Sequence, residues 1–368
     1  MSGATMRAMV RRGPQLLLAD VADVEPAAGQ VVAKVLACGI CGSDLHAVCH
    51  LDHMVETSLR SGAANTIDPA QDLVMGHEFC AEIIDHGPGT EKTLPVGTRV
   101  VSTPFAFGPI GPELIGFSTR YRGAFAERIA LTEALLLPVP NGLSPDIAAL
   151  TEPLSVGTHA VAVANPSPRS VALVIGCGPI GLAVISALKR RGIGPVIAAD
   201  FSVARRALAE RLGADIVVDP ATTSPHSAWS DFDVPATLAD MGMAQMAGRD
   251  LRDAVIFECV GVPGMLQSVI ENAPPTAHVV VVGACVEDDR ILPVIAINKQ
   301  LRFDFVFAYT GFVPGDTAAS ITPPTATTTA TSTAGPVSAS IASTKASSCG
   351  TIGPGRRRSA CPNPGRST

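Results

Sequence analysis

The chain has 368 residues, of which 47% are hydrophobic, 16% are charged and 4% are aromatic, and its formal net charge is −6. This length suits about two domains, and the mild acidity argues against a nucleic-acid binder, which would show a basic face. The apolar residues are mainly Ala, Val, Leu and Ile, which favours an α/β interior. The first residues lack the apolar core of a signal peptide, so we expect a cytoplasmic protein whose nine cysteines form no disulfide framework.

The first part of the chain consists of short apolar runs separated by Gly and Pro. These runs predict strands over residues 30–40, 78–86, 98–103 and 125–131. Residues 47–72 are polar and compatible with helix, so they are interpreted as an inserted surface element. The pattern predicts a mostly β domain over residues 1–155.

From residue 156 onward, predicted strands alternate with predicted helices. The strands are expected over 171–175, 195–200, 216–219, 254–260 and 278–284, and helices over 180–191 and from Ser202 to Gly213. This order predicts a doubly wound parallel sheet over residues 156–300. Residues 170–188 contain no charge, but a Gly-Cys-Gly-Pro turn interrupts them, so a strand, a turn and a helix explain them better than a membrane span.

The end of the chain does not continue this alternation of strands and helices. Residues 301–307 alternate again, and we expect the chain to return over 301–312 to the first domain without completing it. Residues 313–368 are rich in Ser, Thr, Ala, Pro and Gly, and such a segment buries too little apolar surface to fold, so disorder is expected. A shifted reading frame near Gly311 and a genuine extension are both open explanations.

A GxGxxG pattern lies between a predicted strand and a predicted helix. Its first glycine permits a tight turn, its second lets the backbone approach a pyrophosphate, and its third lets the helix pack on the strand. The helix N-terminus then favours phosphate. Asp200 ends the next strand, where a carboxylate accepts hydrogen bonds from ribose hydroxyls and repels a 2′-phosphate. NAD is therefore favoured, and Arg205 and Arg206 keep NADP as the less favoured alternative. The pattern comprises Gly176, Gly178, Pro179, Ile180 and Gly181.

Side chains that can bind a metal are concentrated in three places. Cys38 and Cys41 lie in a CxxC, His77 and Glu78 follow each other, and Glu152 comes later. A thiolate, an imidazole and a carboxylate from separate positions can hold a catalytic zinc with one position open. A CxxC can also be a redox pair, but no thioredoxin-like pattern surrounds it. A second metal site on His46, His50 and His53 is an alternative to the commoner solvated helix face.

The segments CGICGSDLH (38–46), GHE (76–78), EPLSVGTHA (152–160) and GCGPIG (176–181) together resemble zinc-dependent alcohol dehydrogenases of the medium-chain dehydrogenase/reductase superfamily, and EPLSVG is similar to the polyol dehydrogenase branch. The resemblance covers about residues 6–310. It implies a GroES-like catalytic domain, a Rossmann domain and an active site between them. It also implies oxidation of a primary or secondary alcohol or a polyol with NAD, and a homodimer or homotetramer.

The same resemblance implies residue roles. Cys41 and His77 match zinc ligands, with Glu78 or Glu152 as the third, and Asp44 matches an acid that supports them. Ser43 matches the hydroxyl that takes the alcohol proton, and His46 the residue that relays it. Residues 89–123 contain no Cys where the family has a four-cysteine structural zinc, so one zinc is expected. The backbone expected to line the nicotinamide belongs to Val260, Gly261, Val282 and Gly283.

Two other interpretations stay open. A chain that lacks its last catalytic segment could be an impaired or inactive dinucleotide-binding protein. A zinc-free quinone reductase of the same superfamily is the other alternative, and the combination of Cys41, His77 and Glu152 argues against it.

Overall fold

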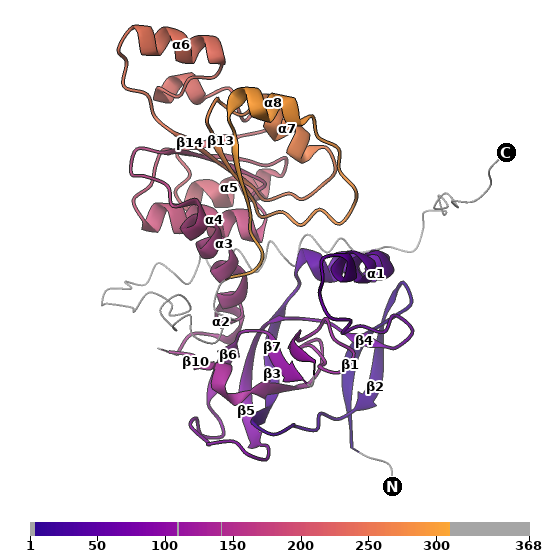
Figure 1. Ribbon diagram of the computed structural model, residues 1–368. Helices are drawn as coiled ribbons and strands as arrows, with labels where there is room; N and C mark the ends of the chain where they lie inside the picture. The colour runs from indigo at the N-terminus through magenta and orange to yellow at the C-terminus, as the bar shows by residue number, and fades with distance from the viewer. Residues whose placement is uncertain (1–3, 109, 141, 310–368) are drawn as a thin grey trace, which may run out of the picture.

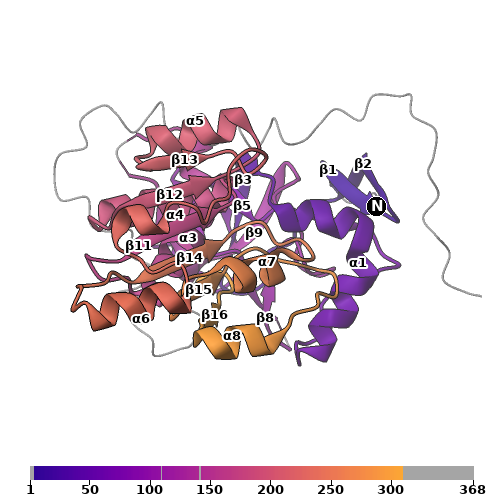
Figure 2. The ribbon, with the colours of Figure 1, turned by 90° about the horizontal axis from the view of Figure 1, so that it is seen from above.

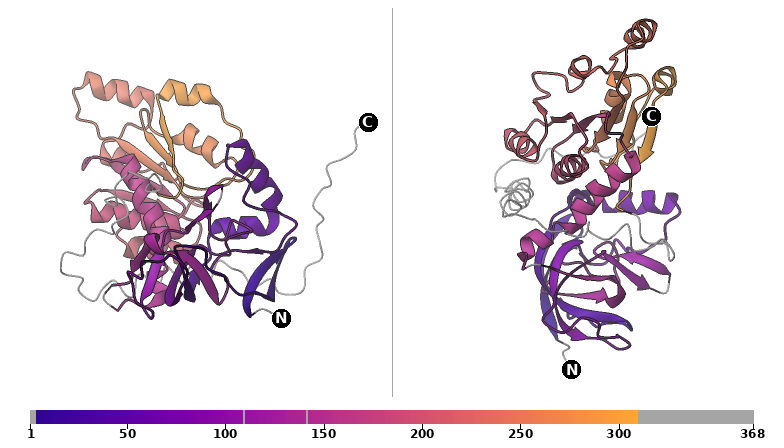
Figure 3. Two further views of the ribbon diagram at one scale, coloured as in Figure 1. Left: turned by 60° about the horizontal axis from the view of Figure 1, so that its bottom comes forward. Right: turned by 90° about the vertical axis from the view of Figure 1, so that its left-hand side faces the viewer.

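The computed structural model describes residues 4–108, 110–140 and 142–309. Two halves lie one above the other, and the long helix α3 (Thr151–Ala164) runs between them (Figures 1 and 3). The lower half in Figure 1 holds residues before α3, and the upper half holds residues after it. Residues 313–368, which were expected to be disordered, lie outside the described residues.

The lower half is built from antiparallel strands, as its alternating sequence predicts. Five strands form a sheet in the order β10-β6-β5-β3-β9, three form β2-β1-β4, and β7 pairs with β8. Inward residues such as Val31, Ile83 and Leu131 are fully buried between these strands. The strands are β1 (Thr5–Arg12), β2 (Gln15–Ala22), β3 (Gln30–Gly39), β4 (Leu73–Val74), β5 (Glu78–His86), β6 (Arg99–Ser102), β7 (Phe105–Gly108), β8 (Gly111–Leu114), β9 (Arg128–Thr132) and β10 (Leu136–Pro138).

The segment expected to be a surface insertion forms most of α1 (Gly42–Arg60), which lies on the side of the lower half that faces the upper half (Figure 1). His50 has non-helical backbone angles, so α1 is two helical segments joined at a kink. Ala47 and Leu51 are its buried apolar contacts. The remaining helices of this half are η1 (Glu133–Leu135), a single 3₁₀ turn, and α2 (Pro145–Ala148), which leads into α3 (Thr151–Ala164).

The upper half is a six-stranded parallel sheet in the order β13-β12-β11-β14-β15-β16, so the predicted doubly wound fold is confirmed. Alternate residues of β11 enter two different cores: Ala172 and Val174 pack with α3, α4 and α5, while Leu173 packs with α7 and Trp229. Helices thus cover both faces (Figure 2). The elements are β11 (Val171–Ile175), α4 (Pro179–Arg190), β12 (Val196–Ala199), α5 (Val203–Arg211), β13 (Ile216–Val218), η2 (Trp229–Phe232), α6 (Leu238–Met246), β14 (Ala254–Glu258), α7 (Met265–Asn272), β15 (His278–Val281), α8 (Pro293–Lys299) and β16 (Arg302–Phe305).

The prediction that the chain returns to the first domain from residue 301 is wrong for β16. This strand pairs in parallel with β15 and extends the sheet of the upper half. Its alternating sequence suits the edge of either sheet, because period-two alternation specifies a half-buried strand and not the strand beside it. Residues 310–312 of the expected return lie outside the described residues.

One stretch of the described chain, Pro145–Ala164, is long and apolar enough to cross a membrane by length and composition. It contains α2 and α3, and α3 packs against α4. Core helices pass the same test, so the stretch is weak evidence for a membrane span. The uncharged residues 170–188 form β11, the glycine turn and most of α4.

A half-buried histidine predicts loss of stability in acid. Burial, together with the charge of Lys299, lowers the pKa of His226 to about 4, and the indole N–H of Trp229 donates to its Nδ1. The unfolded chain, with a histidine pKa of about 6.5, binds this proton first. Stability should therefore fall as the pH drops from about 6.5 to 4. We expect a steeper fall in Tm for wild type than for His226→Gln in differential scanning fluorimetry. Exposed His50→Gln is the control, and parallel curves for wild type and H226Q would contradict the assignment.

Candidate active site

Three potential metal ligands lie close together where β3 ends and β5 begins. One ligand atom each of Cys41, His77 and Glu78 lies within 4.8 Å of the other two. A tetrahedral zinc with bonds of about 2.0–2.3 Å separates its ligand atoms by about 3.3–3.8 Å, so the group needs only slight contraction. Within the described ranges, no other three residues of these types bring their ligand atoms this close together. The histidines of α1 therefore form no such group.

Strand pairing brings these residues together from distant parts of the sequence. Gly39, the last residue of β3, pairs with Glu78, the first residue of β5. A side chain at Gly39 would overlap the Glu78 carboxylate, so the glycine makes room for it. Cys41 follows two residues later at the N-terminal end of α1, and His77 directly precedes β5.

Asp44 supports the group from the first turn of α1. Its side chain is 2% exposed; Oδ2 accepts from the Cys41 backbone N–H at 2.9 Å, and Oδ1 lies 3.5 Å from His77 Nδ1. A carboxylate on Nδ1 leaves the other ring nitrogen for a metal. Burial alone would lower the pKa of His77, but Asp44 and Cys41 raise it to about 10. Asp44 and Cys41 thus favour a positive charge at the position of His77.

Glu152 lies beside this group but outside the set of three close ligand atoms. It stands in the first turn of α3. Burial raises its pKa to about 7; the charges of Cys41 and Asp44 also raise it, and His77 opposes them. Burial and the charge of Glu152 in turn raise the pKa of Tyr309 above its usual range. Tyr309 lies beyond β16, and no pattern in the sequence marked it.

Ser43 and His46 lie on the first turns of α1, close in sequence to Cys41. Both are half-buried. A spacing of three residues places two side chains on one face of a helix. His46 Nδ1 is buried without a hydrogen-bond partner, so a ring nitrogen is available for proton exchange.

The glycine-rich turn has three distinct local environments. Gly176 has a φ of 90°, which favours glycine. A Cβ on Gly178 would meet open space, whereas a Cβ on Gly181 would overlap the carbonyl oxygen of Gly176. Pro179 and Ile180 begin α4 between them. The turn thus leaves exposed backbone at a helix N-terminus, as a phosphate site requires.

Asp200 directly follows β12 and is 9% exposed. Its Oδ2 accepts from the Cys177 N–H at 2.8 Å, and Oδ1 accepts from the Ser202 N–H at 2.7 Å, so it fixes the glycine turn. Arg205 Nη1 is 3.6 Å from Oδ2. Arg206 instead donates to the Asp200 and Phe201 carbonyl oxygens and pairs with Asp219 at 3.0 Å. It is thus committed to partners within the protein.

The two turns that follow β14 and β15 lie back to back. A Cβ on Gly261 would lie 2.6 Å from the Ala284 nitrogen, and one on Gly283 would overlap the Gly261 nitrogen. Val260 is 39% exposed and Val282 is half-buried. The turns therefore present backbone and small apolar surface at the carboxyl end of the sheet.

Glu258 joins both turns, and the sequence analysis missed it. Its Oε1 accepts from the N–H groups of Val260 at 2.7 Å and Gly261 at 2.9 Å. Its carbonyl oxygen accepts from the N–H groups of Val282 and Gly283. A carboxylate that ends an otherwise apolar, buried strand was the available signal, because a buried charge requires partners.

Comparisons with known proteins agree with this geometry. Residues 27–141 match the alcohol dehydrogenase GroES-like domain, and residues 179–321 match the zinc-binding dehydrogenase family. The chain is 34% identical over 294 residues to (R,R)-butanediol dehydrogenase of Bacillus subtilis, which covers 78% of this chain and 79% of that protein. It is 30% identical over 293 residues to L-threonine 3-dehydrogenase of Pyrococcus furiosus, covering 76% and 75%.

A solved structure gives the same answer for the fold. The crystal structure of 2R,3R-butanediol dehydrogenase from Bacillus subtilis superposes with a TM-score of 0.62 at 27% identity, over 86% of this chain and 87% of that chain. The lower half is thus the GroES-like domain and the upper half the Rossmann domain, as the resemblance implied. The chain therefore belongs to the zinc-dependent alcohol dehydrogenases of the medium-chain dehydrogenase/reductase superfamily, enzymes that oxidise alcohols or polyols with a nicotinamide cofactor.

Proposed function

We propose that the chain uses one zinc, held by Cys41, His77 and Glu78, to oxidise a secondary alcohol with NAD. The convergence of a thiol, an imidazole and a carboxylate within 4.8 Å carries this proposal. Such a donor set suits zinc and leaves a fourth position for substrate. Glu152, which lies beside the group, is proposed as a neighbouring acid and not as the third ligand.

The residues around the three proposed zinc ligands have different roles in the reaction. Zinc supplies a Lewis acid that makes the alcohol more acidic, and NAD accepts the hydride. Asp44 holds Cys41 and His77 in place through its two oxygens. Ser43 Oγ would receive the hydroxyl proton, and His46, whose Nδ1 is buried without a hydrogen-bond partner, would take it onward.

The surroundings of Asp200 support NAD over NADP. Its carboxylate is fixed by two backbone N–H groups at the end of β12, where it would repel a 2′-phosphate. Arg206 is occupied by two carbonyl oxygens and Asp219, which leaves Arg205 as the arginine near the ribose position.

The relatives suggest the class of alcohol. Butanediol and threonine, which the names of two relatives contain, can each offer a secondary hydroxyl beside a carbon that bears oxygen or nitrogen. We extend this feature to the present chain as a proposal. The substrate is then a vicinal diol or an amino alcohol.

We also propose a domain boundary near residue 155, within α3, and assembly into a dimer through β16. This strand ends the six-stranded sheet, and Phe305 and Phe307 are 71% and 80% exposed. An apolar edge strand is a template for pairing with a second copy. Light scattering that returns a monomer mass at micromolar concentration would refute the dimer.

The decisive experiment combines metal analysis with a substrate panel. One zinc per chain and NADH formation from a vicinal diol at a higher kcat/KM than from simple primary alcohols are expected. A higher kcat/KM with NADP than with NAD would overturn the cofactor proposal. Turnover of none of the diols, amino alcohols or simple alcohols by the zinc-loaded chain would support the inactive alternative.

Removing the Glu258 carboxylate should weaken cofactor binding without affecting zinc. In Glu258→Ala the N–H groups of Val260 and Gly261 lose their acceptor, so the nicotinamide turn loosens. We expect KM for NAD to rise about tenfold, equivalent to about 1.4 kcal/mol. Glu271→Ala, which removes an exposed carboxylate whose Oε1 accepts from the Gln267 amide, is the matched control. An unchanged KM in folded E258A would show that Glu258 does not position the cofactor.

A further inference from the structure

The lobe of residues 103–123 packs directly against the segment that carries His77. Just beyond it, the N–H groups of Ala124 and Phe125 donate to the carbonyl oxygens of Gly76 and Met75 at 2.8 and 2.9 Å. The Phe117 ring also meets the His77 ring edge-on, with centroids 5.6 Å apart. The placement of His77 therefore depends on where this lobe lies.

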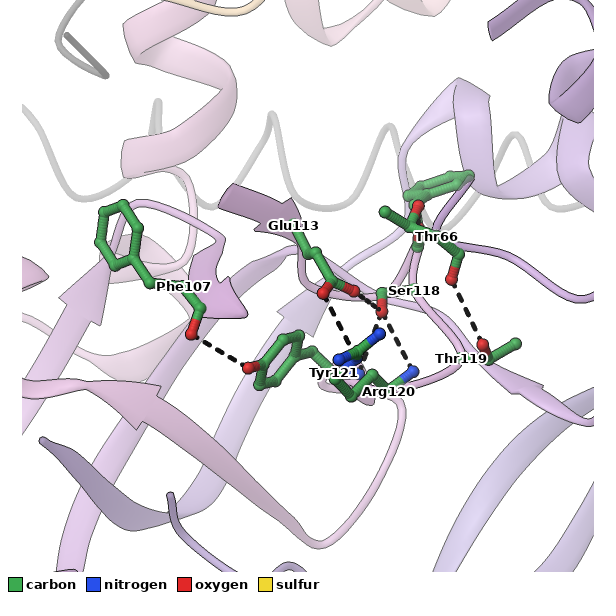
Figure 4. A network of polar contacts seen from close by, with 8 residues as sticks. Thr66, Phe107, Glu113, Ser118, Thr119, Arg120 and Tyr121 are labelled. Atoms are coloured by element: carbon green, nitrogen blue, oxygen red, sulfur yellow. Dashed lines mark hydrogen bonds and ion pairs between the residues drawn. The ribbon is translucent and has the colours of Figure 1, made fainter. Parts of the chain in front are cut away.

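A single buried carboxylate closes the turn that follows Phe117 (Figure 4). Glu113 is 1% exposed, and its Oε2 accepts from the Ser118 hydroxyl at 2.6 Å. The same hydroxyl oxygen accepts from the N–H groups of Arg120 and Tyr121 at 3.0 and 3.2 Å. Arg120 Nε lies 3.3 Å from Glu113 Oε1. The carboxylate thus fastens residues 118–121 through both of its oxygens.

A second set of contacts holds Phe117 from its other side. The Thr66 hydroxyl donates to the Phe117 carbonyl oxygen at 3.0 Å, and the Thr119 N–H donates to the Thr66 carbonyl oxygen at 2.9 Å. The Thr119 hydroxyl donates to the same carbonyl oxygen at 3.2 Å (Figure 4). Thr66 belongs to the connection after α1. The backbone of Phe117 is therefore held on one side by this connection and on the other by the Ser118–Glu113 hydrogen bond. These contacts fix the backbone from which the Phe117 ring extends.

A buried carboxylate is costly unless its partners satisfy it, so its presence here calls for a role. Residues 89–123 contain no Cys, so no thiolate metal centre can hold this lobe together. We infer that Glu113 is a positioning residue for the metal centre: it fastens the lobe that places Phe117 against His77. This inference rests on the proposed function, in which His77 is a zinc ligand.

The test measures metal binding as well as activity. Zinc affinity is measured by competition with a chromophoric chelator, and ligand geometry by the absorption of the cobalt-substituted protein. In Glu113→Ala we expect zinc to bind about tenfold more weakly, the range for residues that orient ligands, with an altered cobalt spectrum. Glu113→Gln keeps an acceptor for Ser118 and should stay within about threefold of wild type.

Glu133→Ala is the matched control. Glu133 also fastens a loop by accepting from backbone N–H groups, those of Glu91 and Thr93, and both of these residues lie outside the lobe. Wild-type zinc affinity and an unchanged cobalt spectrum in folded E113A would overturn the inference. If E113A does not fold, the same two measurements are made on Ser118→Ala. This change removes the hydrogen bond between Ser118 and Glu113 and keeps the carboxylate. A wild-type chain that binds no zinc would instead refute the proposed function.

Discussion

Replacing Cys41 by Ser is expected to remove the bound zinc and to lower kcat/KM by at least about a thousandfold, or about 4 kcal/mol of transition-state stabilisation. A serine hydroxyl stays protonated at neutral pH and binds zinc weakly, whereas a thiol readily supplies the thiolate that zinc prefers. The change leaves His77 and Glu78 as the two remaining members of the group. Zinc per chain and steady-state rates with NAD measure the effect.

The control for this change lies on the same helix. Cys49 is an exposed thiol on α1, and Cys49→Ser should retain zinc and activity. The two variants differ only in which thiol is removed. A C41S protein with one zinc and wild-type turnover would show that Cys41 does not hold the metal, and the proposed mechanism would fail with it.

Adding one methyl group at Gly178 should weaken NAD binding about ten- to a hundredfold, or about 1.4–2.7 kcal/mol. The φ of Gly178 is −69°, which alanine adopts freely, and its Cβ would meet no protein atom within 4 Å. The fold should therefore keep its Tm. The methyl group would instead occupy space that a pyrophosphate needs at the start of α4. Isothermal titration with NAD and a thermal melt separate the two effects.

Gly181→Ala gives the contrasting result. Its Cβ would overlap the carbonyl oxygen of Gly176, so α4 must move away from the turn. We expect this variant to lose about 1–3 kcal/mol of stability, as overpacked sites do, together with NAD binding. Unchanged NAD affinity in Gly178→Ala would place the pyrophosphate elsewhere.

Local patterns predicted the Rossmann half well because each pattern depends only on residues that are close together in the sequence. The buried run 171–175, the glycine turn and the helix after it occur where the sequence indicates. The position of β16 was not predictable in this way. Its alternation is satisfied equally by an edge of either sheet, and the partner strand is decided by tertiary packing.

The ligand candidates were identifiable from residue type, but their arrangement was not. Cys41 and Glu78 meet because Gly39 pairs with Glu78, and a register between two strands so far apart is a tertiary property. Glu113 was missed because it accepts a hydrogen bond from a nearby hydroxyl group and nothing in its sequence context separates it from a solvated acid. Glu258 was missed although it ends an apolar strand, because its backbone donors lie in a turn whose geometry the sequence does not show.

Within the described residues, the chain passes from the lower half to the upper half along α3. Glu152 lies in the first turn of this helix, beside the proposed metal ligands, so the crossing begins at the candidate metal site. Two rigid bodies joined near a single point rotate about an axis through it. We expect such a rotation to swing the distant glycine turn through a long arc while the metal ligands hardly move. The enzyme can then exchange a nucleotide without disturbing the geometry around its ion.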